Sequence, residues 1–350
     1  MKAPYFYRVI TQSPTEFWIN NPTREQIDLA IANHASGCTN NPSYSQKMID
    51  HLREGPYAAR LLDEALLESD DDDEVAAIFQ GKLVAPICEK FMPMFVKTNG
   101  DKGFVTIQGD PIREDDPDVI IREALKNRKI SPNISCKIPT TASGLAAMEY
   151  LIKKDVPLTA TEIFGIAQGV KLCETYMKVS KATGKNPRLY IAHIAGIYDD
   201  HFRNVVERDK IEISPDVLWQ AGMAIARKFY QIIEERSYPG IMVAGGARGL
   251  QHFTEMVGGR VCCTINWDGT ANKLLEQDPP VIYRMFNPIP KKVIEELIEK
   301  ITDFKRGWEE DGLEIEEFEH FGPVQLFRNS FIASWNRVLE LIKERRALIN

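Results

Sequence analysis

The chain has 350 residues, 44% of them hydrophobic and 27% charged, and its formal net charge is −7. Such a chain can bury a sizeable core, and its negative charge gives no general case for binding nucleic acid or an anionic membrane. No apolar run is long enough to cross a bilayer. The six cysteines are scattered without a Cys-x-x-Cys pair, and no signal peptide is recognisable. We therefore expect a cytoplasmic protein with reduced thiols, no structural metal and no cofactor.

Eight strands are predicted, each an apolar or alternating segment bounded by turn or capping residues. In chain order they cover Thr15–Asn20, His34–Asn40, Phe104–Gln108, the stretch Pro132–Thr141, Val156–Thr161, Arg188–Ala195, Gly240–Ala244 and Val261–Ile265. Helical spacing of apolar residues predicts helices at 26–33, within 45–100, and at 116–126, 144–151, 163–179 and 214–236. This alternation predicts an α/β fold, a (β/α)8 TIM barrel. A doubly wound sheet competes with it, but no Gly-x-Gly-x-x-Gly follows an early strand.

Two segments of the N-terminal half depart from strict alternation. Residues 1–13 are expected to be a loose lead-in to the first strand. In residues 45–100, helical spacing of apolar residues predicts a long, mostly helical insertion between the second and third strands. The acidic run Asp70–Glu74 within it is expected to be a solvated loop or a helix start.

The pattern changes again near residue 285. Two amphipathic helices follow, at 291–305 and 329–347. We therefore divide the chain into a barrel, residues 1–285, and a helical C-terminal extension, residues 286–350. The extension is expected to pack on the barrel or on a partner subunit, so a homo-oligomer is possible.

The fourth strand carries a lysine whose position is uncommon. Alternation puts Ile134, Cys136 and Ile138 on one face and Lys137 on the other, at the last step before Pro139 ends the ladder. In a barrel, reactive groups lie at the carboxyl ends of the strands. An amine held in a partly dry mouth has a lowered pKa, as a Schiff-base lysine requires. The alternative is a strand-end lysine that reaches into water.

Other polar residues fall at or just past predicted strand ends, and together they favour an active site. They are Asn20, Asn41, Gln108, Lys137, Thr161 and Arg248. An unprotonated amine such as that of Lys137 adds to a ketone without a metal, and the resulting Schiff base acts as an electron sink. The amides can orient the hydroxyls of a polyol.

A glycine-rich loop follows the seventh strand. Gly246 and Arg248 lie within Gly-Gly-Ala-Arg-Gly and predict an anion site, because phosphate is often held by the loops after strands seven and eight of a barrel. A plain tight turn is the alternative. A metal site is a weaker hypothesis, and its candidate ligands are His193, Asp199, Asp200 and His201.

Four stretches, in order, resemble the transaldolase family and cover most of residues 15–270. They are Thr15–Asn21, Ser36–Ser43 with the family's Gly-x-Thr-x-Asn-Pro-Ser motif, Ser135–Thr141 with its Lys-x-Pro-[AS]-Thr motif, and Thr159–Gln168. The resemblance implies metal-free transfer of a dihydroxyacetone unit between sugars or sugar phosphates through a lysine Schiff base. It identifies the catalytic residues as Lys137, Gln108, Asn20 and Thr161. The implied substrate-binding residues are Asn41, Thr39, Thr159, Arg248 and Gly246.

The chain departs from the family at its acid/base positions. The family's strand-one Asp aligns with Asn20 and its strand-three Glu with Gln108, and an amide cannot exchange a proton at neutral pH as a carboxylate can. A Gln at the strand-three position resembles the fructose-6-phosphate aldolases, which cleave rather than transfer. The strand-six Ser and Arg that bind phosphate are absent. Replacement proton-transfer groups are sought among Glu162, Asp110, Asp199, Tyr198 and His193.

Three hypotheses follow from these features. The favoured one is a lysine-dependent transaldolase or aldolase with an altered substrate, which lacks phosphate or carries another anion. The second is a barrel that binds a sugar or a carbonyl metabolite without turnover. The third is a scaffold that uses its C-terminal helices to bind a partner.

Overall fold

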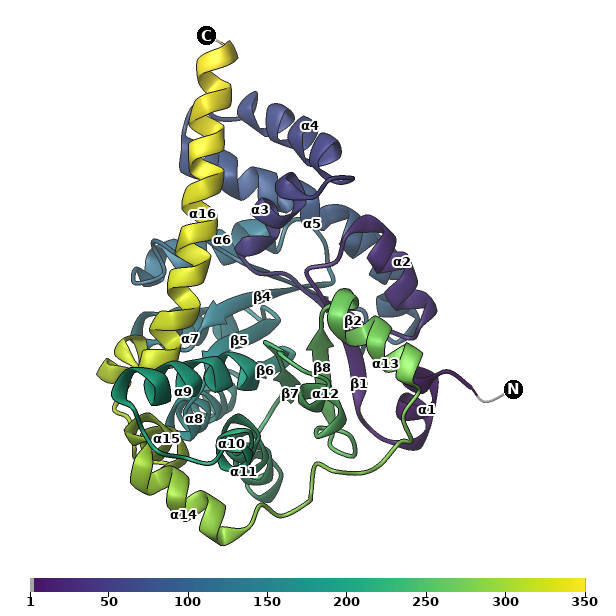
Figure 1. The fold of residues 1–350 in the computed structure, drawn as a ribbon. Helices are drawn as coiled ribbons and strands as arrows, with labels where there is room; N and C mark the ends of the chain where they lie inside the picture. The colour runs from purple at the N-terminus through teal and green to yellow at the C-terminus, as the bar shows by residue number, and fades with distance from the viewer. Residues whose placement is uncertain (1–2, 350) are drawn as a thin grey trace.

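The computed structural model describes residues 3–349 and contains a closed barrel of eight parallel strands (Figure 1). The strands are β1 (Glu16–Asn20), β2 (Gly37–Thr39), β3 (Val105–Gln108), β4 (Ile134–Pro139), β5 (Leu158–Ile163), β6 (Leu189–His193), β7 (Ile241–Ala244) and β8 (Val261–Ile265). Each pairs with its neighbours in sequence, and β8 pairs with β1. The predicted TIM-barrel fold is confirmed.

The amino-terminal end of the barrel is closed by aromatic packing. Trp18 and Tyr190 point into the barrel with ring centroids 4.8 Å apart, and Phe104 meets Tyr190 at 5.7 Å. On the other face of β1, helix α1 (Tyr5–Gln12) stacks Phe6 on Phe17 at 4.2 Å. The prediction of a loose lead-in is therefore wrong. Its apolar residues recur at helical spacing and bury one face of a short helix.

The N-terminal insertion is helical, as predicted. It follows α2 (Arg24–Ala32) and consists of α3 (Ser43–Asp50), α4 (Gly55–Leu66) and α5 (Asp72–Lys97). The acidic run is a helix start, because Asp71 caps α5 and accepts a hydrogen bond from the amide of Glu74. Carboxylates in a first turn are favoured by the helix dipole.

The remaining barrel helices are α6 (Pro117–Asn127), α7 (Ala142–Lys153), α8 (Ile166–Thr183), α9 (Ala195–Asp209), α10 (Pro215–Leu218), α11 (Ala221–Glu235), α12 (Gln251–Thr254), the π-helical turn η1 (Trp267–Ala271) and α13 (Asn272–Gln277). The single helix expected at 214–236 is instead two helices, broken between α10 and α11, and the helix α9 before it was not predicted. Strand β6 ends at His193, so the residues expected to extend it start α9 instead.

The C-terminal part is helical, with α14 (Lys291–Lys300), α15 (Thr302–Trp308), the 3-10 turn η2 (Ile315–His320) and the long α16 (Gly322–Ile349). Figure 1 shows α16 rising from beside α9 past α3 and α4, and it contacts α3, α5 and α9. It begins seven residues earlier than the predicted helix at 329. The division at residue 285 stays a prediction.

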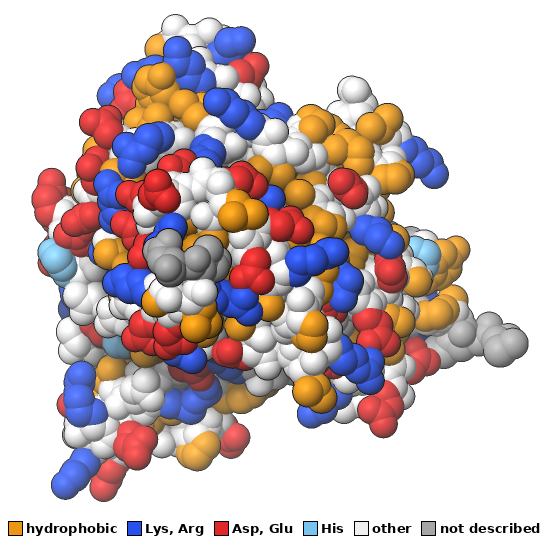
Figure 2. Space-filling view, turned by 90° about the horizontal axis from the view of Figure 1, so that it is seen from above, with side chains coloured by type: hydrophobic (Ala, Val, Ile, Leu, Met, Phe, Trp, Pro, Cys, Tyr) orange, Lys and Arg blue, Asp and Glu red, His pale blue; other side chains and the backbone are white. Residues whose placement is uncertain are grey.

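The face seen from above mixes the two signs of charge. Figure 2 shows Lys and Arg side chains interspersed with Asp and Glu across it. Within residues 3–349, no helix has both the length and the apolar character that a membrane span requires. All six cysteines are buried and free.

Candidate active site

A cavity of about 180 Å³ lies at the carboxyl ends of the strands. Six of the nine predicted site residues line it: Asn20, Thr39, Asn41, Lys137, Gly246 and Arg248. Helix α16 supplies Phe327, Ser330 and Phe331 to its wall, and none of these three was predicted. The polar strand ends therefore do meet in one place, while their individual roles stay predictions.

Lys137 is sheltered but unpaired. Its side chain is 7% exposed, and its Nζ lies 5.9 Å from the ring centre of Phe327 and 5.6 Å from that of Phe331. With the part of the chain that the structure describes, Nζ makes neither an ion pair nor a hydrogen bond. Burial lowers the pKa of Lys137 to about 8, although Glu162 and Glu114 favour its charged form. A useful fraction of the amine is thus neutral near pH 7, as a nucleophile requires.

A bulge in β5 brings Glu162 to the same region. The register with β6 shifts between Ala160 and Ile163, and Glu162 has a φ of 60°. Thr161 faces the barrel interior, so strict alternation would turn Glu162 outward. The bulge turns it inward instead, and its Oε1 accepts a hydrogen bond of 3.1 Å from Nε2 of Gln108. Left-handed backbone at a residue other than glycine is strained and is concentrated at functional sites.

Gln108 joins two buried carboxylates. Its Nε2 also lies 3.4 Å from Oε2 of Glu114, whose Oε1 forms an ion pair of 3.0 Å with Nε of Arg328 on α16. Burial raises the pKa of Glu162 to about 7, whereas Lys137, Gln108 and Arg328 favour its charged form. Burial and the charge of Glu162 also raise the pKa of Glu114. The pKa values of Lys137 and Glu162 are therefore both displaced toward neutral pH.

The wall formed by β1, β2 and β8 consists of polar side chains that are hydrogen-bonded to one another. Oγ1 of Thr39 donates to Oδ1 of Asn20 at 2.9 Å and contacts Oγ1 of Thr264 at 2.6 Å. Nδ2 of Asn20 donates to Oδ1 of Asn266 at 2.9 Å, and Oδ1 of Asn41 accepts from the neighbouring Asn21 side chain. These side chains are held in fixed orientations, as a polyol-binding wall requires.

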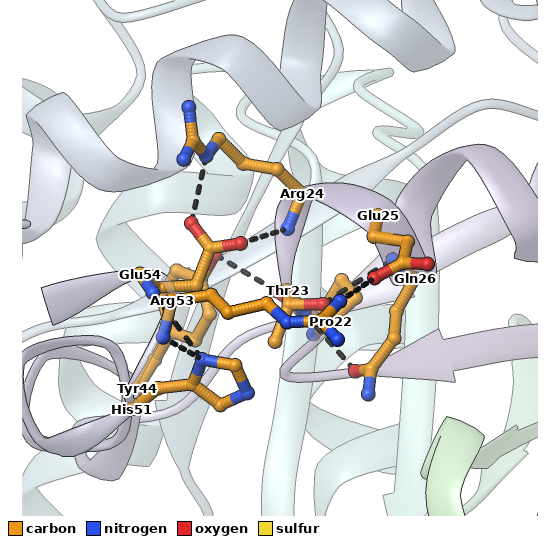
Figure 3. A network of polar contacts seen from close by, with 9 residues as sticks. All are labelled: Pro22, Thr23, Arg24, Glu25, Gln26, Tyr44, His51, Arg53 and Glu54. Atoms are coloured by element: carbon orange, nitrogen blue, oxygen red, sulfur yellow. Dashed lines mark hydrogen bonds and ion pairs between the residues drawn. The ribbon is translucent and has the colours of Figure 1, made fainter. Parts of the chain in front are cut away.

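The loop after β1 is anchored by a polar network beside this wall (Figure 3). Arg24 forms an ion pair of 2.7 Å with Glu54, and Thr23 and Gln26 form a reciprocal cap at the start of α2. The hydroxyl of Tyr44 donates to the carbonyl of Pro22 at 3.0 Å. The network joins the β1–α2 loop to α3 and the α3–α4 turn, and so holds the mouth on this side.

The two threonines of β5 do not line the cavity. Thr159 is in register with Lys137 and shares a hydrogen bond of 2.7 Å with Ser135 deeper in the barrel. Thr161 is fully buried near Pro139, and its Oγ1 has no hydrogen-bond partner among residues 3–349. Thr161 can therefore turn its hydroxyl to a group bound beside it, whereas Thr159 supports the strand.

The loop after β7 lines the mouth beside β8. Gly246 has a φ of 69°, and a side chain there would collide with Ile194, so this tight turn needs glycine. Nε of Arg248 pairs with Oδ2 of Asp200 on α9 at 2.5 Å. The predicted anion-binding arginine is therefore already engaged. Ala192 and Ile197 line the wall from which the family's phosphate-binding Ser and Arg are missing.

The candidate metal ligands on β6 and α9 point to different partners. His193 is buried near Phe229, Asp199 pairs with His252 at 3.0 Å, and His201 pairs with Asp303 at 2.6 Å. Within the described chain, no cluster of three or more His, Cys, Asp or Glu side chains is arranged to hold a metal ion. The geometry gives the metal hypothesis no support.

Known proteins match the chain across the barrel. The family described as Transaldolase/Fructose-6-phosphate aldolase matches residues 17–313. A transaldolase from Thiobacillus denitrificans is 23% identical over 335 residues, covering 87% of this chain and 88% of that protein. A transaldolase from Mycobacterium bovis is 24% identical, and one from Acidothermus cellulolyticus 26%. Those two matches span 61% and 64% of the relatives, or 62% and 65% of this chain. The family match covers well over half of this chain, so the chain belongs to the transaldolase/fructose-6-phosphate aldolase family.

Proposed function

We propose that the protein transfers or cleaves a dihydroxyacetone unit of a ketose through a Schiff base on Lys137. The observation that carries the proposal is an unpaired, nearly buried amine that faces a polar cavity at the barrel mouth. Family membership and relatives named transaldolase support it.

The chemistry follows from the amine. Neutral Nζ adds to the ketone carbon of the ketose, and loss of water gives an iminium ion. The hydroxyl on the fourth sugar carbon then gives its proton to a base of the site, the bond between the third and fourth carbons breaks, its electron pair moves into the iminium to form an enamine, and an aldehyde leaves. The proton is later returned to the oxygen of an acceptor aldehyde or to the enamine carbon. Transfer ends when the enamine attacks an acceptor aldehyde, and cleavage ends when a proton is added instead. In both cases water then hydrolyses the Schiff base and frees Lys137.

Transfer is favoured over cleavage because the matched relatives bear the name transaldolase. The same cavity has Asn20, Thr39 and Asn41 to hold sugar hydroxyls. We infer that the substrate is a small sugar or sugar phosphate handled in the cytoplasm. Homo-oligomer formation stays a prediction.

Trapping tests this proposal directly. The protein is incubated with dihydroxyacetone or fructose 6-phosphate, reduced with borohydride, digested and analysed by mass spectrometry. We expect the mass increment on the peptide that contains Lys137. K137M should abolish it, whereas K153M, which removes a surface lysine paired with Glu149, should leave it unchanged.

A barrel that only binds sugars would give another pattern. Ketoses would raise the melting temperature of both the wild type and K137M, and no adduct would form with any ketose of a broad panel. That result would overturn the proposed function.

A further inference from the structure

We propose that Glu162 exchanges protons with Lys137 and with the intermediates formed on it, replacing the acid/base carboxylate that β3 lacks. This inference rests on the proposed function and assigns a proton-transfer residue to it. Gln108 stands at the strand-three position, and its amide donates a hydrogen bond to Glu162. The carboxylate that the family has on β3 is therefore replaced by one on β5, which is hydrogen-bonded to the residue at the β3 position.

The backbone of β5 is deformed to place this one side chain. Gln108 on β3 and Thr159 on β5 flank Lys137 in register, and the bulge returns Glu162 to the interior just above Thr159. Glu162 is 0% exposed. A plain outward-facing glutamate would reach the helices around the barrel and would need neither the bulge nor the left-handed backbone.

One oxygen of the carboxyl group remains available. Oε1 of Glu162 accepts the Gln108 amide, whereas Oε2 is buried and has no hydrogen-bond partner within the described chain. Oε1 of Gln108 is also buried without a partner there. A buried carboxylate oxygen is costly to leave unpaired, so a site that retains one is poised to bind a proton. The Lys137 ammonium is a source of that proton, because Gln108, which donates to Glu162, is in register with Lys137 on the neighbouring strand.

The proton balance of Schiff-base formation then closes on two residues. Glu162 takes one proton from the Lys137 ammonium; the neutral amine adds to the ketone, and a proton passes from its nitrogen to the former ketone oxygen to give the neutral carbinolamine. Glu162 then gives its proton to the carbinolamine hydroxyl, which leaves as water while the nitrogen lone pair forms the iminium bond. No external acid is consumed, and hydrolysis runs the same two transfers in reverse.

Three of the other four candidate groups hold hydrogen bonds elsewhere. Asp110 accepts the amide of Ile112, and Asp199 is bound to His252 and to the amide of Gly222. The hydroxyl of Tyr198 donates to the carbonyl of Asp303, and His193 is buried near Phe229. Burial lowers the pKa of His193 to about 4, so its ring is neutral near pH 7.

The isosteric variant E162Q tests the inference in the full-length protein. We follow adduct formation with dihydroxyacetone by borohydride trapping from pH 6 to 9. E162Q should slow it at pH 7 by roughly 100-fold or more, the usual effect of losing a general acid/base. The pH at which the rate levels off should also fall, because a charge that favours the Lys137 ammonium is gone. E149Q, on the surface of α7, should match the wild type.

The exchange variant Q108E/E162Q tests whether E162Q is slow because it lacks a carboxylate or because its structure has changed. It keeps the number of atoms and moves the carboxylate back to β3, so we expect it to recover at least a tenth of the wild-type rate. E162D, which keeps a carboxylate on a residue that tolerates left-handed backbone, should retain more activity than E162Q. It serves as the second test if E162Q folds poorly.

The outcomes separate the two proposals. If the wild type forms the Lys137 adduct and E162Q forms it at the same rate with an unshifted pH profile, the role of Glu162 is refuted and the proposed function stands. If the wild type forms no adduct with any ketose, the proposed function fails, and the role of Glu162 falls with it.

Discussion

Nε of Arg328 on α16 lies 3.0 Å from Oε1 of Glu114, a carboxyl group buried in the loop after β3. Glu114 in turn shares the Gln108 side chain with Glu162. The charge of Arg328 on the C-terminal helix therefore belongs to the same polar network as the carboxyl group of Glu162. The helix that covers the barrel mouth thus also balances its buried negative charge.

Breaking this pair on one side should destabilise the protein. R328Q leaves Glu114 buried without its counter-charge, and we expect the free energy of unfolding in urea to fall by roughly 3 kcal/mol. E114Q/R328Q removes both charges and should lose clearly less than R328Q alone. Equal losses in the single and double variants would show that the charge pairing is not what stabilises α16 on the barrel.

The sequence predicted the barrel because each strand has local signals. Alternation, turn residues and helix caps identify the eight strands, and the strand ends fix which residues meet at the mouth. The misses were also local. Helix α1 has only three buried residues, and α9 begins directly after β6 without a turn to mark it.

Long-range contacts were beyond the sequence pattern. Arg328 and Glu114 are separated by more than 200 residues, and nothing near Phe327 or Phe331 marks them as cover for Lys137. Asp200 was expected only as a weak metal ligand, whereas the fold pairs it with Arg248. Glu162 was one of five proton-transfer candidates, because strict alternation does not reveal the bulge that turns it inward.

Removing the aromatic cover should raise the pKa of Lys137. F331A admits water to the amine and favours its charged form, so the rise of adduct formation with pH should move to higher pH. F304A removes a buried ring of α15 that stacks on Trp308 and does not line the cavity. It should cost about 3–5 kcal/mol of stability, as F331A does, without moving the profile. A profile shift in both variants would contradict the prediction.

Releasing Arg248 should favour phosphorylated substrates. Asp200 holds its guanidinium and also pairs with Arg203, so D200N leaves the cavity arginine free to bind an anion. We expect the KM for a ketose phosphate to fall by roughly five-fold, since an exposed charge pair is worth at most about 1 kcal/mol. The KM for the unphosphorylated ketose should not change.

Two controls identify the arginine that is responsible. D200N/R248M should lose the gain, whereas R203M, which removes the partner that does not line the cavity, should leave the wild-type preference intact. An equal change in KM for both ketoses in D200N would show that Asp200 does not govern phosphate selection.

The stability of the folded state should report the buried carboxyl group of Glu162. Burial raises its pKa from 4.5 to about 7, so between these values the native state binds a proton more tightly than the unfolded chain. The corresponding stabilisation is fully present below pH 4.5 and is lost as the pH rises through about 7. E162Q cannot titrate there. The free energy of unfolding of the wild type, relative to that of E162Q, should therefore decrease by up to about 3 kcal/mol between pH 4.5 and 8. Urea unfolding at several pH values measures the difference, and two parallel curves would show that Glu162 is already charged at acid pH, held by Lys137 as an ordinary buried ion pair.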